Sequence, residues 1–157
     1  MADYLPLVNQ LYVHTMDAIR EVHDIPKNLP YSVFPALSVN FGPHVACTPH
    51  KDHGNLADGF CWLLAGGSFD SKKGGHLYLP ELNLAIEFPA GSSIFFPSAL
   101  LAHGNIPLEN DAKQIRWSMT QYAASGLFQW VEYGYHSWKA LQKKHPEIAE
   151  SIKCVEM

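Results

Sequence analysis

Residues 74–108 read GGHLYLPELNLAIEFPAGSSIFFPSALLAHGNIPL. Short apolar runs alternate here with glycine, proline and asparagine, and this pattern continues over residues 33–122. It predicts about eight short strands without long helices between them, which is typical of a closed or nearly closed antiparallel structure. Such a jelly roll encloses a small cavity at one mouth. The candidate strands are 36–40, 45–48, 60–64, 76–79, 85–88, 93–96, 101–105 and 116–122. Turn residues separate them, and Gly66-Gly67 is expected to do so after the strand 60–64.

The two ends of the chain carry a different pattern. Residues 4–24 place apolar side chains at loosely helical spacing, which predicts one amphipathic helix ending before Pro26. The tail 126–157 predicts one or two further helices packed outside the sheet. Since 157 residues is the length of one domain, we expect a single mainly β domain, 1–157, with its core at 33–122 and flanking helices.

The composition and net charge limit which kinds of molecule the chain is expected to bind. Hydrophobic residues make up 47% of the chain and charged residues 17%, so a packed core is expected. The formal net charge is −4, whereas proteins that bind duplex DNA usually present a basic face. No strong basic patch is visible. A nucleic acid therefore stays open as a substrate, but this chain alone would hold it weakly.

Cysteine usage and the absence of long apolar stretches indicate the compartment. The three cysteines are an odd number and their spacing fits no zinc motif, which favours a reducing environment. The first ten residues lack the pattern of a signal peptide, and no apolar stretch approaches a membrane span. We expect a soluble intracellular protein, cytoplasmic or nuclear and without a membrane partner. The sequence leaves its oligomeric state open.

His50-Lys51-Asp52 and His103 are the candidate metal ligands and catalytic centre. Two His and one carboxylate on a single face hold Fe(II) while leaving positions open for a 2-oxo acid and dioxygen. Residues i and i+2 of an extended segment point the same way, so His50 and Asp52 can reach one ion. His103, at the end of a distant apolar run, would supply the third ligand. Taken singly, each His is more commonly a surface residue or a satisfied core residue.

The order of several motifs strengthens this interpretation. Asn40 and Phe41-Gly42-Pro43 come first, followed by His50-x-Asp52, Gly74-Gly75-His76-Leu77, a Pro-x-Gly turn at 89–91, His103 and Arg116-Trp117-Ser118. Over residues 33–122 this order resembles the double-stranded β-helix, a jelly roll, of 2-oxoglutarate/Fe(II)-dependent dioxygenases. The run 74–108, together with TQYAASGLFQW at 120–130, looks most like fungal members of the ten-eleven-translocation and base-J-binding-protein oxygenase group.

The resemblance implies a co-substrate site at the last core strand. In such enzymes a basic residue pairs with the distal carboxylate of 2-oxoglutarate, and a nearby Ser adds a hydrogen bond. Arg116 and Ser118 match this pairing, and a guanidinium suits a carboxylate because it can bind it bidentately. Arg116 could equally be an outward surface residue, and Lys113 is the alternative anchor. Asn40 is a further candidate for contact with the co-substrate or a ligand, or simply a turn residue.

Other polar residues near the motif have weaker assignments. We expect His44, His53 and His76 not to bind the catalytic iron, although a role in orienting a ligand is open to each. Asn55 and Asp58 follow the metal motif in a loop expected to face the substrate mouth.

The expected function is an oxygenase that uses Fe(II), 2-oxoglutarate and O2 to hydroxylate or demethylate a C–H bond. The group resemblance points to a methylated nucleobase such as 5-methylcytosine. The alternatives are a small-molecule or amino-acid hydroxylase of the same fold, a cupin-like protein holding zinc or manganese without a 2-oxo acid, and a scaffold module without turnover.

Overall fold

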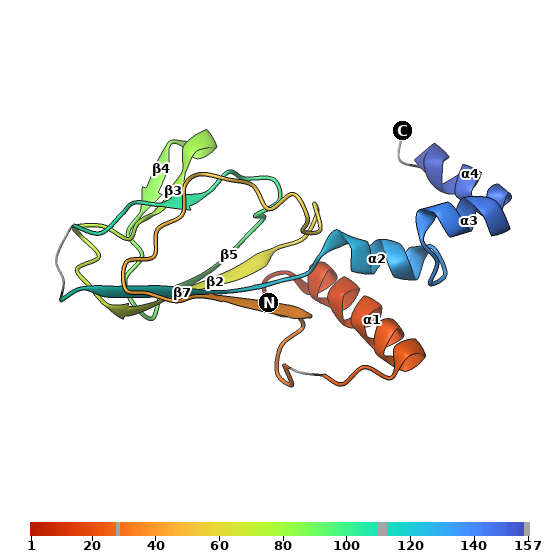
Figure 1. Ribbon diagram of the computed structural model, residues 1–157, viewed down its shortest axis with the longest axis horizontal. Coiled ribbons are helices and arrows are strands. Elements are labelled where there is room, and N and C mark those ends of the chain that lie inside the picture. The colour runs from red at the N-terminus through yellow and green to blue at the C-terminus, as the bar shows by residue number, and fades with distance from the viewer. Residues whose placement is uncertain (28, 110–112, 156–157) are drawn as a thin grey trace.

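Two antiparallel sheets face each other in the computed structural model, which describes residues 1–27, 29–109 and 113–155 (Figure 1). The larger sheet has the strand order β1-β7-β2-β5 and the smaller one β4-β3-β6. This is the mainly β jelly roll predicted from the sequence. The strands are β1 Ala36–Asn40, β2 Cys61–Ser68, β3 Leu77–Leu79, β4 Leu84–Ile86, β5 Ser93–Phe96, β6 Gly104–Asn105 and β7 Ile115–Tyr122, with a short 3-10 helix at Pro80–Leu82.

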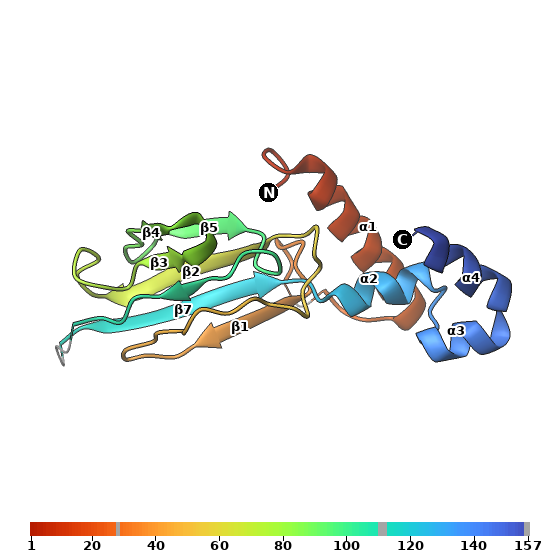
Figure 2. The same cartoon turned by 90° about the horizontal axis from the view of Figure 1, so that it is seen from above.

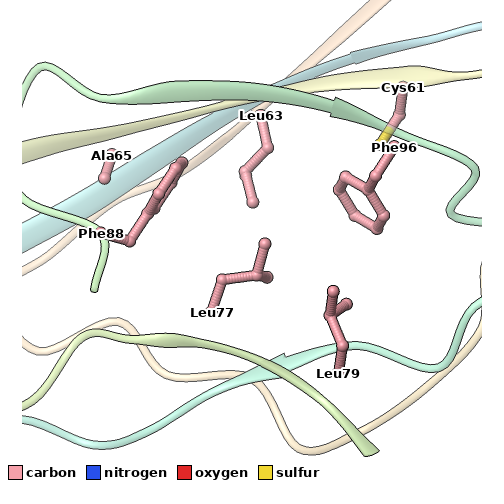
Figure 3. Packing of buried hydrophobic residues seen from close by; sticks show 7 residues of the cluster. All are labelled: Cys61, Leu63, Ala65, Leu77, Leu79, Phe88 and Phe96. Atoms are coloured by element: carbon pink, nitrogen blue, oxygen red, sulfur yellow. The ribbon is translucent and has the colours of Figure 1, made fainter. Parts of the chain in front are cut away.

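The core lies between the two sheets. Cys61, Leu63 and Ala65 alternate along β2 and are buried, because successive side chains of a strand point to opposite faces. Figure 3 shows Leu63 pointing toward Leu77 of β3, from the opposite sheet. Complete burial of one leucine contributes roughly 1.5–3 kcal/mol, so this layer holds the sheets together. The cluster comprises Cys61, Leu63, Ala65, Leu77, Leu79, Phe88 and Phe96.

The prediction of a strand at 45–48 was wrong. This segment crosses from the larger sheet to the smaller one, so it makes no ladder with either (Figure 1). Val45 N–H donates to the Arg116 carbonyl of β7 at 3.3 Å, whereas the Cys47 carbonyl accepts from Asn105 N–H of β6 at 2.9 Å. Pro49 follows and has no N–H to donate. The segment instead lies along the outer edge of β6.

Gly66-Gly67, expected from the sequence to punctuate two strands, lies inside β2. A Cβ on Gly66 would collide with the Trp117 ring, and one on Gly67 would collide with the Ile115 carbonyl. Gly67 also has φ +119°, a conformation that residues with a side chain rarely adopt. These glycines therefore allow β2 and β7 to approach closely rather than forming a turn.

Helices cover one end of the sheets. The helix predicted at 4–24 is present as α1, Pro6–His23, which packs on α2, Ser125–Glu132, through Tyr12, Met16 and Phe128. The tail holds three helices rather than one or two, because α3, Trp138–Lys144, and α4, Pro146–Val155, follow α2. Both α3 and α4 extend away from the sheets instead of packing on them (Figures 1 and 2). In the described ranges no helix has both the length and the apolar character needed to cross a membrane.

We predict that Gly67→Ala destabilises the fold by roughly 1–3 kcal/mol, because the new methyl group meets backbone at a positive φ. Thermal unfolding measures the effect. Gly126→Ala in α2 is the matched control, since a Cβ there meets nothing within 4 Å. A Gly67→Ala protein that melts with the wild type would contradict the close β2–β7 pairing.

Candidate metal centre and co-substrate cavity

His50, Asp52 and His103 come together at one end of the space between the sheets. One ligand atom from each lies within 4.8 Å of the other two. His50 Nε2 is 3.5 Å from Asp52 Oδ1, and His103 Nε2 is 3.9 Å from Asp52 Oδ2. Two ligands bound at about 2.1 Å to one ion lie at most about 4.2 Å apart, so small side-chain rotations bring this set onto a metal. Among the described residues this is the group of His, Cys, Asp and Glu placed to hold an ion.

Backbone pairing places the two histidines opposite each other. His50 N–H donates to the His103 carbonyl at 3.0 Å, and His103 N–H donates to the His50 carbonyl at 2.9 Å. Side chains of such a directly paired couple lie on the same face. The two rings are accordingly 4.5 Å apart between centroids. Asp52, two residues after His50, joins them on that face.

Carbonyl groups select the tautomer of both histidines. His50 Nδ1 lies 2.8 Å from the Thr48 carbonyl, and His103 Nδ1 lies 3.0 Å from the Leu101 carbonyl. A carbonyl only accepts hydrogen bonds, so each Nδ1 carries the proton and each Nε2 keeps its lone pair. Metal-binding histidines commonly have this arrangement.

Burial keeps His103 neutral. Its side chain is mostly enclosed and packs edge-on against Phe96, with ring centroids 4.8 Å apart. Desolvation lowers the pKa of His103, and the nearby His50 lowers it further, while the Leu101 carbonyl and Asp52 oppose the shift. The neutral imidazole is the form that binds a metal.

Asn55 holds Asp52 in position, a role that the sequence did not predict: its loop was expected to face the substrate mouth, with an N-cap or turn role equally open for Asn55. Its Nδ2 donates to Asp52 Oδ2 at 3.2 Å and to Ser98 Oγ at 3.1 Å. Asp52 N–H in turn donates to the Ser98 carbonyl at 3.0 Å. The spacing of three residues between Asp52 and Asn55 was the available signal, since it allows a side chain to reach back across a turn.

Glu81 contacts both chain segments that carry the metal ligands. Its carboxylate accepts from Lys51 Nζ at 2.7 Å and from Ala102 N–H at 2.6 Å. Lys51 lies between the first two ligands, and Ala102 directly precedes the third. Both contacts lower the pKa of Glu81. One exposed carboxylate therefore links both ligand-bearing segments.

A cavity of about 410 Å³ extends from these three ligands between the sheets. Its walls combine apolar side chains with hydroxyl and amide groups from both sheets. Besides the three ligands, the lining includes Cys47, Leu63, Leu77, Asn105, Ser118 and Thr120.

Arg116 lies on β7, two residues before Ser118, which lines the cavity. It pairs with Gly67, and its side chain is completely buried. The guanidinium donates through Nη1 to the Val45 carbonyl at 3.0 Å and lies 5.9 Å from the centre of the Phe69 ring. Nε and Nη2 are enclosed without a hydrogen-bond partner, and no carboxylate of the described chain pairs with Arg116.

An unpaired guanidinium in such a place is costly, and it fits an anionic ligand. Burial lowers the pKa of Arg116, because it penalises the charged form, while Cys47 acts in the opposite direction. A carboxylate entering from the cavity would satisfy the two free N–H positions. Arg116 itself is not among the residues that line the cavity, whereas Ser118 on the same strand is.

Ser118 and Asn40 line the cavity on the strands β7 and β1, close in sequence or pairing to Arg116. Ser118 is two residues along the same face of β7 and lines the cavity. Asn40 Nδ2 donates to Ser118 Oγ at 3.1 Å, as expected from the pairing of β1 with β7. Because the hydroxyl oxygen accepts from Asn40, its own proton is available to a ligand. The structure thus joins Ser118 and Asn40 by a hydrogen bond in the cavity wall, two residues along β7 from Arg116.

The remaining candidates lie elsewhere. Lys113 is exposed before β7 begins and does not line the cavity. His44 contacts the Gln114 carbonyl through Nε2 at 2.9 Å, and His53 is exposed. Neither they nor His76 join the group of metal ligands.

Cys61 lines the cavity next to Asp52 but stays a neutral thiol. Burial raises its pKa to about 11, and the Asp52 carboxylate adds to the shift, although Ser98 opposes it. Cys61 does not belong to the group whose ligand atoms converge, which consists of His50, Asp52 and His103. Cys47 is half-buried and also lines the cavity.

We predict that Asn55→Ala weakens metal binding about 10- to 100-fold, because Asp52 loses the group that orients it. Anaerobic Fe(II) titration, with Co(II) as a spectroscopic substitute, measures the affinity. Asp58→Asn is the control, since Asp58 is exposed in the same loop. Equal affinities in the two variants would show that Asn55 does not position the carboxylate.

Comparison with known proteins places the fold. No protein-family model matches the sequence, and no curated protein matches it significantly. Among solved structures, NgTET1 in complex with 5mC DNA superimposes with a TM-score of 0.54 at 18% sequence identity, covering 79% of this chain and 52% of NgTET1. The chain therefore spans about half the length of that protein. At this identity the likeness establishes a shared jelly-roll fold.

Two further structures are more distant. The viral collagen prolyl hydroxylase of Paramecium bursaria Chlorella virus-1, in complex with 2-oxoglutarate, has a TM-score of 0.38 at 18% identity, covering 68% of each chain. An RmlC-like cupin from Desulfovibrio desulfuricans has a TM-score of 0.36 at 14% identity, covering 64% of this chain and 97% of its own. Likenesses this weak support no inference about the site.

Proposed function

We propose that this protein is an Fe(II)- and 2-oxoglutarate-dependent oxygenase of the ten-eleven-translocation and base-J-binding-protein type. The observation that carries the proposal is the unpaired guanidinium of Arg116, which is completely buried on β7 two residues from Ser118, a lining residue of the cavity that also contains His50, Asp52 and His103. A site with a metal at one end and a buried cation at the other suits a 2-oxo acid with a second carboxylate.

In this proposal the metal ligands and the co-substrate-binding residues come from different parts of the fold. His50, Asp52 and His103 would hold Fe(II). Arg116 and Ser118 bind the distal carboxylate of 2-oxoglutarate and set its distance from the metal. The apolar walls, including Leu63 and Leu77, limit the entry of water. Bound Fe(II) with 2-oxoglutarate and dioxygen supplies the oxidation of the substrate C–H bond.

A cupin-like metal protein without a 2-oxo acid fits these residues less well. It would explain the three metal ligands but would leave Arg116 without a partner. Burying a charge without a partner costs several kcal/mol, so a scaffold or a simple metal site gains nothing from keeping it.

For the primary substrate we propose a methylated nucleobase such as 5-methylcytosine. The likeness of residues 74–108 and 120–130 to the ten-eleven-translocation group supports this choice, as does the fold shared with NgTET1, whose structure contains 5mC DNA. The net charge of −4 favours single-stranded or partner-delivered substrate, because the chain offers little attraction to duplex phosphates. A small molecule or amino acid is the alternative substrate class.

The central prediction concerns the weak visible charge-transfer band of the Fe(II)–2-oxoglutarate chelate. Anaerobic titration of the apo protein with Fe(II) and then 2-oxoglutarate should produce this band. Asp52→Ala and His50→Ala should abolish iron binding. Arg116→Ala should keep iron but need at least about tenfold more 2-oxoglutarate, because it loses a charge-assisted pair.

Two further variants make the Arg116 result specific. Arg116→Lys keeps the charge without the planar fork and should fall between the wild type and Arg116→Ala. Arg20→Ala, which removes an arginine paired with Asp17 on α1, is the control and should behave as the wild type. Iron binding without a band in the wild type would favour the cupin-like alternative, and no iron binding would favour a scaffold.

A substrate screen tests the nucleobase proposal. Under turnover conditions the wild type should consume 5-methylcytosine in single-stranded oligonucleotides faster than in duplexes, as measured by mass spectrometry of digested nucleosides. Raising the salt concentration should change this rate little, because few phosphate contacts are available. Unchanged oligonucleotides alongside a small molecule that stimulates succinate formation would favour the alternative class.

A further inference from the structure

We infer that Asn105 is an additional co-substrate-binding residue, whose side-chain amide donates a hydrogen bond to 2-oxoglutarate between the metal and Arg116. This inference rests on the proposed function and adds a residue that neither the metal motif nor the Arg-x-Ser motif contains. It would also explain why a polar side chain is kept inside the cavity.

The first observation is an unsatisfied donor. Asn105 lines the cavity, and its Nδ2 is enclosed without a hydrogen-bond partner. An enclosed amide without a partner is unfavourable, and most such groups in proteins are satisfied. Among the described side chains only three residues have such atoms: His76, Asn105 and Arg116. Of these, Asn105 lines the cavity, and Arg116 is two residues along β7 from Ser118, which also lines it.

The second observation is the place of Asn105 on β6. It follows His103 by two residues, so both side chains point to the same face. Its strand partner is Leu77, which is buried in the core and lines the cavity. Both relations direct Asn105 into the space between the sheets. The Asn105 backbone is held there by its N–H, which donates to the Cys47 carbonyl at 2.9 Å.

Asn105 also lies between the two ends of the proposed ligand. On the metal side its strand neighbour is His103. On the other side, Gly75 N–H donates to the carbonyl of Ile106 at 2.8 Å, and a Cβ built on Gly75 would lie 3.2 Å from Arg116 Nε. Asn105 therefore lies in the chain between the metal ligand His103 and Ile106, and Ile106 is hydrogen-bonded to Gly75 beside the Arg116 guanidinium.

The number of free hydrogen-bond donors at this site matches the number of acceptor positions on a carboxylate. An ionised carboxyl group offers about four acceptor positions. Arg116 supplies the free N–H groups on Nε and Nη2, Ser118 supplies a hydroxyl proton, and Asn105 supplies an amide N–H. An anion with several oxygen atoms satisfies all of these groups together, whereas a neutral apolar ligand would satisfy none.

Substitution of Asn105 should spare the fold, because Nδ2 makes no hydrogen bond that would be lost. We therefore expect Asn105→Ala to bind Fe(II) as the wild type does. Its apparent Kd for 2-oxoglutarate should rise about 10- to 100-fold, since a hydrogen bond to a charged group is removed. Asn105→Asp keeps the shape but sets a carboxylate against the ligand, so it should bind 2-oxoglutarate more weakly still.

The experiment is anaerobic titration of each Fe(II)-loaded protein with 2-oxoglutarate, following the chelate band. Circular dichroism and Fe(II) affinity are measured first for every variant. Asn9→Ala removes the same type of side chain from α1, outside the cavity, and serves as the control. A raised Kd in both Asn105 variants, with Asn9→Ala and Fe(II) affinity unchanged, supports the inference.

Two results would overturn it, and they are distinguishable. If the wild type forms the band and Asn105→Ala and Asn105→Asp give the same Kd, Asn105 does not bind the co-substrate, although the proposed function stands. If the wild type forms no band at any concentration, the proposed function fails and the role of Asn105 fails with it.

Discussion

The two backbone hydrogen bonds between His50 and His103 are the constraint on which the site depends. They join a segment that forms no regular strand to the short strand β6. Because the paired residues face the same way, both imidazoles meet over one point, and Asp52 follows on the same face. Glu81 strengthens this junction from outside by contacting both ligand-bearing segments. The metal centre is thus a property of the edge of the smaller sheet.

The proposed anchor for the co-substrate comes from the other sheet. Arg116 and Ser118 belong to β7, which lies between β1 and β2 in the larger sheet. The distance between the two functional ends is therefore set by the packing of Leu63 and Leu77 across the core, as Figure 3 shows for the side chains. Substitutions that change this apolar layer would alter the relation between the metal and the guanidinium without touching either.

Polar groups inside so small a core have a thermodynamic cost. Arg116 and Asn105 leave donors unsatisfied in the part of the chain that the structure describes, and the cavity between them reduces packing. Such a departure from good packing is more common at functional sites than elsewhere. A ligand that satisfies these donors should stabilise the folded protein, since it binds the folded state preferentially.

The sequence by itself determined the mainly β class, most strand positions and the pairing of His50 with Asp52, because these follow from alternation along one extended segment. It also placed Arg116 and Ser118 on one face of a strand, without deciding whether that face pointed inward. Only the tertiary structure decided that Arg116 is buried, that His103 opposes His50, that Asn55 donates to Asp52 and that Asn105 lines the cavity. It likewise turned Gly66-Gly67 into part of β2. The physical reason is that periodicity specifies which side chains share a face, whereas contacts between distant strands specify what that face meets.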